Sequence, residues 1–530
     1  MKSFYLLLTT LSIAYANKCS TNVDSTTGVL TWNPSTDGTT IPPNAFEDCN
    51  TIKIAVFNGV TSIGNNAFKN AGDAGGMNLT FNALETISQY AFYDTKIKSF
   101  TAPSVTTIEP GAIEMMTSVA SGIDFTFDAL TSIQAEGFRG AKIKSLVAPL
   151  VTTIGDNAFV GVNDPFDGTT IQLDLNFPAL TTIEHSAFKM ANIKSLVAPL
   201  VTTIGVSAFK NAGHADGMDL NFPVLTSIGV SAFELAKIKS LVAPSLITIP
   251  VAAFYGAGHV DGMDLTFDAL DEISSVQNSI VKGAFERATI KSLVAPLLTK
   301  IGSKALLEVN FITTIQLDLN FPALTSIDEQ AFKEATIKSL VAPSLITIPV
   351  AAFQGAGHVD GMDLTFDALD DIGNNAFDLA TIKSLVAPLL TRIGSRSFEN
   401  VNQDGTQNNL LLDLNFPVLT HIPENAFQGA RLNTLIVPSI SSASGTDAFK
   451  YTKVANYVVI SKASGLQTNN DIQTIHYVDD VLLYLGFATQ QQLKTEYHGR
   501  GLLTEDVPLY LPIATKQQLK TEYQSRGTCT

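Results

Sequence analysis

Three loops carry the residue types best suited to metal or acid–base chemistry. Each reads Gly-His-x-Asp-Gly-Met-Asp, and the members are His214 with Asp216 and Asp219, His259 with Asp261 and Asp264, and His358 with Asp360 and Asp363. Imidazole and carboxylate groups bind transition metals or calcium. One imidazole and two carboxylates leave each loop short of ligands, however, and other copies of the loop lack the histidine. We therefore predict no metal site, and interpret Asp-Gly as a turn motif with an incidental histidine.

A column of aspartates offers a second kind of chemistry. One Asp recurs in each long copy of a repeat described below, at Asp124, Asp174, Asp219, Asp264, Asp318, Asp363 and Asp413, with Asn78 in the first copy. Neighbours in this column should lie two strands, or about 10 Å, apart. A retaining glycosidase needs its two carboxylates about 5 Å apart. The sequence also lacks a nucleophile elbow, a zinc-protease motif and a phosphate loop, so we predict a non-enzymatic protein without a cofactor.

Composition narrows the class of protein further. The 530 residues include 33 Lys and Arg against 49 Asp and Glu, which gives a net charge of −16. Such an acidic chain suits a nucleic-acid backbone poorly, so no nucleic-acid partner is expected. Hydrophobic residues make up 45% of the chain and charged residues only 15%. The chain therefore has enough apolar material for a large core.

An Ala-Phe pair marks the repeat that must position these side chains. The phenylalanines are Phe46, Phe68, Phe92, Phe138, Phe159, Phe188, Phe209, Phe233, Phe254, Phe285, Phe332, Phe353, Phe377, Phe398, Phe427 and Phe449. Ile113 and Leu306 fill the two gaps in this series. Short and long spacings alternate, so the true unit is a pair of copies.

The segment before each Ala-Phe pair has the pattern of a half-buried strand. Residues 238–249 and 263–273 are a short and a long copy, and both alternate apolar and polar positions. A proline such as Pro244 ends the first strand, where its missing N–H is tolerated. One unit cannot bury its apolar side alone, whereas stacked units can. We predict one solenoid over residues 46–450, with a parallel β-sheet on one face and about 85 Å of length at about 4.8 Å per strand.

The consensus Leu-x-x-Pro-x-Leu-Thr-x-Ile-Gly-x-x-Ala-Phe, seen for example at residues 151–159, resembles the BspA-like leucine-rich repeat family. The resemblance implies a right-handed leucine-rich-repeat solenoid with short helical or irregular turns opposite the sheet. It also implies a secreted or surface protein, with adhesion or host and matrix binding in some members, and no catalytic residues. Members often carry a Cys three residues after the Phe, and here only Cys49 keeps it.

Eleven other copies hold alanine in that column, which is typical of a tightly packed inward position. Cys49 is therefore most simply a small buried hydrophobic residue. The alternative is a Cys19–Cys49 disulfide in an N-terminal cap, which an exported protein permits. Cys529 stands too far along the chain for pairing with Cys19 within one molecule to be expected. The possibility left open is an intermolecular disulfide, or self-association through the C-terminal tail.

Outward columns flank the aspartates. Serines occupy the equivalent position of the short copies, and a second column alternates valines with Thr or Asn, including Thr266 and Thr365. We predict that these columns and the Asp column form a binding face for an extracellular protein or glycan; the alternative is a solvated sheet face. Lysines such as Lys144 and Lys239 just before the short strands are expected to neutralise the Asp column. Recurrent Thr-Thr-Ile segments raise ice binding as a weaker hypothesis, and Asn78-Leu79-Thr80 is the only N-glycosylation sequon, on a strand that makes its use doubtful.

The two ends of the chain do not follow the repeat pattern. Lys2, an apolar run over residues 4–13 and Ala14-Tyr15-Ala16 predict a cleaved signal peptide at residues 1–16. The run is too short for a membrane span, which needs about 20 residues. Residues 17–45, with Trp32 as a lid, and residues 451–478 are expected to be caps, and residues 479–530 a duplicated helical tail. We thus predict a secreted, possibly surface-associated recognition or adhesion protein; the alternative is a structural component of an extracellular layer.

Overall fold

The computed structural model describes residues 18–118, 122–164, 171–274, 282–311, 313–403, 410–443, 447–461 and 475–478. It divides into two compact units, one of Met1–Ala342 with Ala356–His358 and the other of Pro343–Gly355 with Val359–Thr530. This boundary falls inside the repeat array that the sequence predicts to be continuous. The predicted signal peptide and the helical tail lie outside the described residues.

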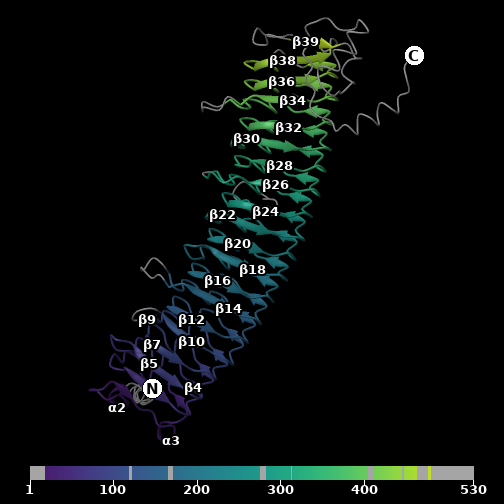
Figure 1. The fold of residues 1–530 in the computed structure, drawn as a ribbon. Coiled ribbons are helices and arrows are strands. Elements are labelled where there is room, and N and C mark those ends of the chain that lie inside the picture. Colours follow the sequence, from purple (N-terminus) through teal and green to yellow (C-terminus); the bar gives the residue numbers. More distant parts are fainter. Residues whose placement is uncertain are drawn as a thin grey trace, which may run out of the picture. The chain divides into compact units, whose positions relative to one another are not determined.

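The first unit contains a long-strand face made of parallel strands that pair in chain order (Figure 1). One sheet consists of β1 (Val29–Leu30), β3 (Ile54–Phe57), β5 (Met77–Phe81), β7 (Lys96–Thr101) and β9 (Thr117–Ser118). The next consists of β10 (Ile123–Thr126), β12 (Ile143–Val147), β14 (Leu173–Asn176), β16 (Ile193–Val197), β18 (Met218–Asn221), β20 (Ile238–Val242), β22 (Gly258–Thr266) and β24 (Thr289–Val294). β26 (Asp318–Asn320) and β28 (Ser339–Val341) pair in the same parallel sense. This arrangement confirms the predicted parallel leucine-rich-repeat solenoid.

A second set of two-residue strands forms another face of the same unit. Nine of them pair in one parallel sheet: β2 (Thr40–Ile41), β4 (Ser62–Ile63), β6 (Thr86–Ile87), β8 (Thr107–Ile108), β11 (Ser132–Ile133), β13 (Thr153–Ile154), β15 (Thr182–Ile183), β17 (Thr203–Ile204) and β19 (Ser227–Ile228). Four more follow: β21 (Thr248–Ile249), β23 (Glu272–Ile273), β25 (Lys300–Ile301) and β27 (Ser326–Ile327). A proline follows many of the long strands, for example Pro149 after β12 and Pro244 after β20, and supplies no N–H for continued pairing where the chain turns into the short strand.

The second unit repeats this arrangement. Its long strands are β30 (Gly357–Thr365), β32 (Thr381–Val386), β34 (Leu412–Asn415), β36 (Arg431–Val437), β38 (Lys453–Ser461) and β39 (Ile475–Val478). Its short strands are β29 (Thr347–Ile348), β31 (Asp371–Ile372), β33 (Arg392–Ile393), β35 (His421–Ile422) and β37 (Ser442–Ala443).

A column of stacked phenylalanine rings fills the interior of each unit. From Phe138 to Phe285 successive rings lie with centroids 4.9–5.3 Å apart and nearly parallel. In the second unit the column from Phe353 to Phe449 has centroid distances of 5.2–5.4 Å. The eleven alanines that stand three residues after the column position are buried as predicted. Because the ring-to-ring spacing is close to the spacing between strands, a phenylalanine can recur in nearly every copy, with Ile113 and Leu306 as the two exceptions.

The segments around each phenylalanine are turns rather than helices in the described residues. Asn157 and Gly161, two residues before and after Phe159, both have left-handed backbones, with φ of 56° and 65°. The N–H of Phe159 donates to the carbonyl of Ala187 in the next copy, at 2.7 Å. Bonds from copy to copy thus alternate with single turns inside the segment, such as Val160 N–H to the Asn157 carbonyl at 3.1 Å, and no continuous helix forms. Of the two predicted possibilities, the irregular turn is the one found.

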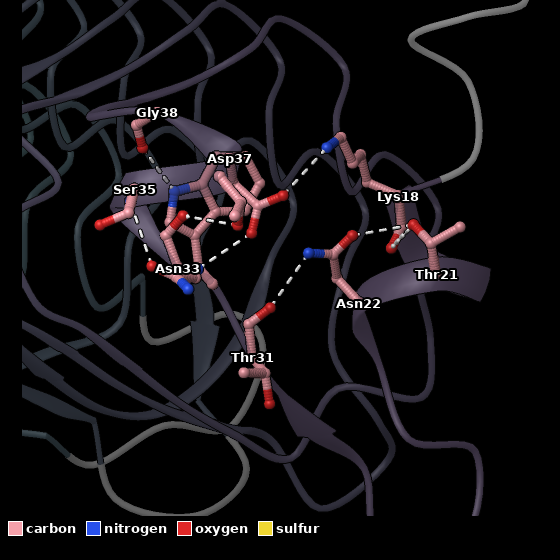
Figure 2. Close-up of polar contacts among 10 residues, drawn as sticks. Lys18, Thr21, Asn22, Thr31, Asn33, Ser35, Asp37 and Gly38 are labelled. Atoms are coloured by element: carbon pink, nitrogen blue, oxygen red, sulfur yellow. Dashed lines mark hydrogen bonds and ion pairs between the residues drawn. The ribbon is translucent and has the colours of Figure 1, made fainter.

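An N-terminal cap covers the first copy. Helix α3 (Pro34–Asp37) follows Trp32, whose ring meets the edge of Phe46 at 6.0 Å and whose Nε1 donates to the carbonyl of Gly38 at 2.8 Å. Figure 2 shows Lys18 reaching Asp37, at 3.5 Å, from helix α2 (Lys18–Asn22). Trp32 is thus a buried lid residue, as predicted.

The cap also holds a disulfide that corrects the simpler prediction for Cys49. Cys49 is bonded to Cys19, with the Cα atoms 5.8 Å apart. Interpreting Cys49 as a free buried thiol is therefore wrong. Its column position is inward, and the residue is 2% exposed, but α2 lies against this turn and brings a second thiol to it. No other copy of the column holds cysteine, so the repeats could not reveal a covering helix. No helix among the described residues is long and apolar enough to cross a membrane.

Candidate binding face

The predicted Asp column lies on the outer side of the long strands in both units. Asp124, Asp174, Asp219, Asp318 and Asp413 are exposed, and Asp264 and Asp363 are half-buried. The residues on either side of each Asp are buried, as in the Leu173–Asn176 strand. Asp174 and Asp219 each pair with Ser195 of β16 across the sheet. Aspartates therefore alternate with serines from strand to strand, which keeps the negative charges two strands apart.

Within the described residues, six of the seven aspartates, all but Asp264, accept a hydrogen bond from the hydroxyl group on the following strand. Ser195 Oγ donates to Asp174 Oδ1 at 2.5 Å, and Ser240 Oγ donates to Asp219 Oδ1 at 2.6 Å. Ser145 donates to Asp124 in the same way. In the second unit Thr434 replaces the serine and donates to Asp413 at 2.5 Å. One carboxylate oxygen of each of these residues is thus used inside the sheet.

The other carboxylate oxygen divides the column into two groups. Asp124, Asp264 and Asp363 accept Lys144, Lys291 and Lys383 at 3.0–3.3 Å. Asp174, Asp219, Asp318 and Asp413 make no ion pair within the described residues. Neutralisation by the lysine column therefore holds for the first group only.

Glutamine competes for the lysine beside two members of the second group, Asp174 and Asp318. Lys194 donates to Gln172 Oε1 at 3.3 Å, and Lys338 donates to Gln316 Oε1 at 3.0 Å. Each glutamine stands two residues before its aspartate, so it lies beside the same lysine on the neighbouring strand. At Asp174 and Asp318 a neutral amide thus takes the ammonium group and leaves the carboxylate without a cation. Asp219 and Asp413, by contrast, have Gly217 and Leu411 at the glutamine position.

The pKa of Asp124 reflects these contacts. The hydrogen bond from the Ser145 hydroxyl group, with a smaller contribution from Lys144, holds the pKa of this carboxyl below its usual value. The Asp124 side chain is 59% exposed. The group is therefore a solvated, hydrogen-bonded carboxylate, and this environment does not suit a general acid.

A second outward column runs beside the aspartates. Its valines are 37–54% exposed: Val147, Val197, Val242, Val294, Val341 and Val386. Between them stand Asn or Thr, as in Val197 paired with Asn176 and Asn221. Thr266 and Thr365 are half-buried in this column. The predicted site residues thus all face outward on the long strands.

The identity of the residue two positions after each Asp follows the division of the column. Lys-paired Asp124, Asp264 and Asp363 precede Thr126, Thr266 and Thr365. The four aspartates without a cation precede Asn176, Asn221, Asn320 and Asn415. The alternation of Thr and Asn is visible in the sequence and could have divided the seven aspartates before the structure was known. Asp174 and Asp219 are the two members of the second group that are neighbours in the column, and they lie on β14 and β18 of the first unit.

From β8 to β19 the short-strand face carries hydroxyl groups in place of charges, whereas later short strands carry ion pairs such as Lys300–Glu272 and Arg392–Asp371. Thr152 Oγ1 donates to the carbonyl of Thr131 at 3.2 Å, and Thr202 Oγ1 donates to that of Thr181 at 3.3 Å. The following residues, such as Thr153 and Thr203, make no side-chain hydrogen bond within the described residues. The Thr-Thr-Ile segments are thus regular, as expected. The first hydroxyl group of each pair donates to a backbone carbonyl of the preceding copy, as at Thr152 and Thr202.

The histidine loops are structural in the first unit. His214 Nδ1 accepts the N–H of Asp216 at 3.2 Å, and His259 Nδ1 accepts that of Asp261 at 3.3 Å. Both imidazoles are nearly buried, with 13% and 12% of the side chain exposed. The histidines therefore brace their turns and are not incidental. No group of three or more His, Cys, Asp or Glu side chains that could hold a metal occurs in the described part of the chain.

Comparison with known proteins now identifies the family. The profile of the BspA type leucine-rich repeat region matches six copies, over residues 39–165, 163–261, 278–404 and 406–470. The chain belongs to the BspA-type leucine-rich repeat family. No curated protein matches this leucine-rich repeat chain significantly. The family assignment therefore rests on the repeats themselves.

Several solved leucine-rich repeat structures are similar to this member of the family. A leucine-rich repeat protein from Bacteroides ovatus is 15% identical, with 83% of this chain and 87% of that chain covered and a TM-score of 0.30. A leucine-rich cell surface protein from Faecalibacterium prausnitzii is 16% identical, with 72% and 87% covered and a TM-score of 0.28. The pneumococcal vaccine antigen PcpA is 16% identical, with 75% and 86% covered and a TM-score of 0.27.

Proposed function

We propose that this BspA-type leucine-rich repeat protein is a secreted, non-enzymatic binding scaffold. In this proposal the long-strand face of the first unit binds an extracellular protein or glycan in cell-surface recognition or adhesion. The observation that carries the proposal is the pair of cation-free aspartates, Asp174 on β14 and Asp219 on β18, which flank Ser195 of β16. Their second carboxylate oxygens have no protein partner within the described residues, so they are available to a ligand.

The surroundings of these two aspartates support a recognition role. Val197 lies between Asn176 and Asn221 in the adjoining column and is 54% exposed. An apolar side chain flanked by amides and carboxylates offers contact area together with hydrogen-bond donors and acceptors. Backbone groups within the sheet are already paired from strand to strand, so a ligand on this face is held by side chains. The low share of charged residues elsewhere makes this patch chemically distinct.

A binding panel with matched variants tests the proposal. The intact protein is screened against extracellular-matrix proteins and an array of glycans, and each hit is measured with D174A/D219A and with D124A/D264A. We expect D174A/D219A to weaken the relevant hit about tenfold, as loss of about 1.4 kcal/mol would. The control pair removes aspartates already neutralised by lysine and should change binding less than threefold.

Two outcomes would remove parts of the proposal. Hits that respond equally to both double variants exclude this face as the site. Endogenous protein found inside the producing cell with residues 1–16 still attached excludes secretion. Localisation on the cell surface or in the medium, together with the expected variant pattern, supports both parts.

A further inference from the structure

Asn78 occupies an unusual place in the Asp column. It stands where the later long copies hold aspartate, and with Leu79 and Thr80 it forms the only N-glycosylation sequon of the chain. On β5 the residues Met77, Leu79 and Phe81 are buried, whereas Asn78 and Thr80 are half-buried and face outward together. Acceptor asparagines are found on the surface of exported proteins. The strand therefore displays both residues of the sequon that take part in recognition.

The hydrogen bonding of Asn78 leaves its nitrogen available. Ser99 Oγ donates to Asn78 Oδ1 at 2.8 Å. Nδ2 makes no hydrogen bond within the described residues. An N-linked sugar replaces one hydrogen of Nδ2 and leaves Oδ1 in place, so the bond from Ser99 survives the modification. The folded sheet thus accepts a substituent here without losing a contact.

The strands beside Asn78 leave an apolar patch uncovered. Val29, Ile54 and Val56 are 40%, 43% and 50% exposed. Val29 pairs with Ile54, Ile54 pairs with Asn78, and Val56 pairs with Thr80 across β1, β3 and β5. The Lys-paired and cation-free aspartates that make later strands hydrophilic are missing at this end of the face. A bulky, soluble substituent on Asn78 would cover these three side chains.

We infer that Asn78 carries an N-linked glycan that covers the apolar patch of Val29, Ile54 and Val56. The donor class is a lipid-linked oligosaccharide diphosphate. Asn78 Nδ2 attacks C1 of its first sugar, the N–C1 bond forms, the bond from C1 to the diphosphate oxygen breaks, the lipid diphosphate leaves, and the amide nitrogen loses one proton. The inference needs the export proposed above but not the proposed binding face.

The chain offers a matched control for this site. Asp264, Leu265 and Thr266 occupy the same column positions on β22 as Asn78, Leu79 and Thr80 on β5. D264N therefore creates a second copy of the same tripeptide in the same strand context. T80A removes the sequon but keeps Asn78, whereas T80S keeps the sequon.

The test is the intact mass of full-length protein secreted by a eukaryotic host, before and after treatment with a peptide N-glycosidase. We expect one enzyme-sensitive glycan on the wild type and on T80S, none on T80A, and two on D264N. Secreted wild-type protein without a glycan overturns the inference, whether D264N is modified or not. Retention of the chain in the host with its N-terminus uncleaved contradicts the proposed secretion instead, so the two failures are distinguishable.

A second measurement tests the covering role. Binding of a hydrophobic fluorescent dye is compared for wild type, enzymatically deglycosylated wild type and T80A. We expect higher dye binding for both unglycosylated forms, and return to the wild-type level when I54S/V56S is added to T80A. Equal dye binding in all forms would show that the glycan does not cover the apolar patch.

Discussion

The two outward faces of the first unit rest on the same interior but arrange polar side chains with different periods. On the long-strand face, Asp174, Ser195 and Asp219 alternate along three successive strands. On the short-strand face, Thr153, Thr182 and Thr203 follow one another on three successive strands without alternation. From β8 to β19, both outward positions of every short strand hold Thr or Ser.

Charge explains the difference in period. Two carboxylates on adjacent strands would lie about 4.8 Å apart and repel each other. A serine between them keeps the charges apart and donates a hydrogen bond to one of them. A hydroxyl group both donates and accepts, so identical threonines can follow one another on every strand. The alternation of short and long copies in the sequence is therefore a requirement of the charged face, while the hydroxyl face repeats with every strand.

The largest expected effect comes from breaking the alternation on the charged face. S195D places a carboxylate between Asp174 and Asp219 and removes the hydrogen bond to Asp174. Two like-charge contacts of about 1 kcal/mol each, with one lost hydrogen bond of about 1 kcal/mol, should lower the free energy of unfolding by about 2 to 3 kcal/mol. Urea unfolding of S195D and wild type at low salt measures the change.

T182D is the matched variant on the hydroxyl face. It introduces the same charge between two neutral threonines, Thr153 and Thr203, and should cost less than about 1 kcal/mol. High salt should reduce the penalty of S195D more than that of T182D, because the Debye length falls to about 3 Å at 1 M. Equal penalties for the two variants would contradict the explanation from charge.

The second prediction distinguishes the two faces by the pH titration of Asp124, which lies on the charged face. The pKa of Asp124 is lowered in the folded state, chiefly by the Ser145 hydroxyl group. A lowered folded pKa means that this contribution to stability is present above the unfolded value of about 3.9 and is lost as pH falls through the folded pKa. S145A should move the pKa of Asp124 upward toward its usual value and reduce the stability that the protein loses in acid.

Carboxyl NMR titration of Asp124 in wild type, S145A and K144M measures this directly. The upward shift should be larger in S145A than in K144M, since the serine bond is the leading cause. T152V, on the hydroxyl face, should leave the titration unchanged. An ordinary pKa for Asp124 in the wild type, or no response of that pKa to S145A, would contradict the role given to the serine hydrogen bond on the charged face.

The sequence predicted the columns of the solenoid well because each has a local signature. Phe159 and its equivalents recur beside alanine, and the period-two pattern around Asp174 places that residue outside. These rules depend only on which side of a strand a residue occupies. They therefore hold in every copy. The closure of the copies into a coil was predicted from the family resemblance.

The sequence did not predict which partner each side chain would choose. Lys144 reaches Asp124, whereas Lys194 reaches Gln172, because a glutamine is present beside only the second lysine. That choice depends on side chains from adjacent copies, which lie twenty or more residues apart in the chain. Cys49 was misjudged for a similar reason, since its partner Cys19 belongs to a cap helix with no counterpart in the repeats.

The smallest expected effects test whether the hydroxyl face is held by side chains or only by its backbone. Thr152 Oγ1 donates to the carbonyl of Thr131, but this oxygen also accepts the N–H of Thr152 at 2.9 Å. T152V therefore leaves no unpaired carbonyl and should cost about 0.5 kcal/mol, the low end for a hydrogen bond. Thr153 makes no side-chain hydrogen bond in the described residues, so T153V should change stability by less than about 0.5 kcal/mol in either direction. Urea unfolding of T152V, T153V and the triple variant T153V/T182V/T203V measures these differences. A cost of about 2 kcal/mol or more for the triple variant would mean that these hydroxyl groups bond from strand to strand, and both faces would then depend on lateral side-chain contacts.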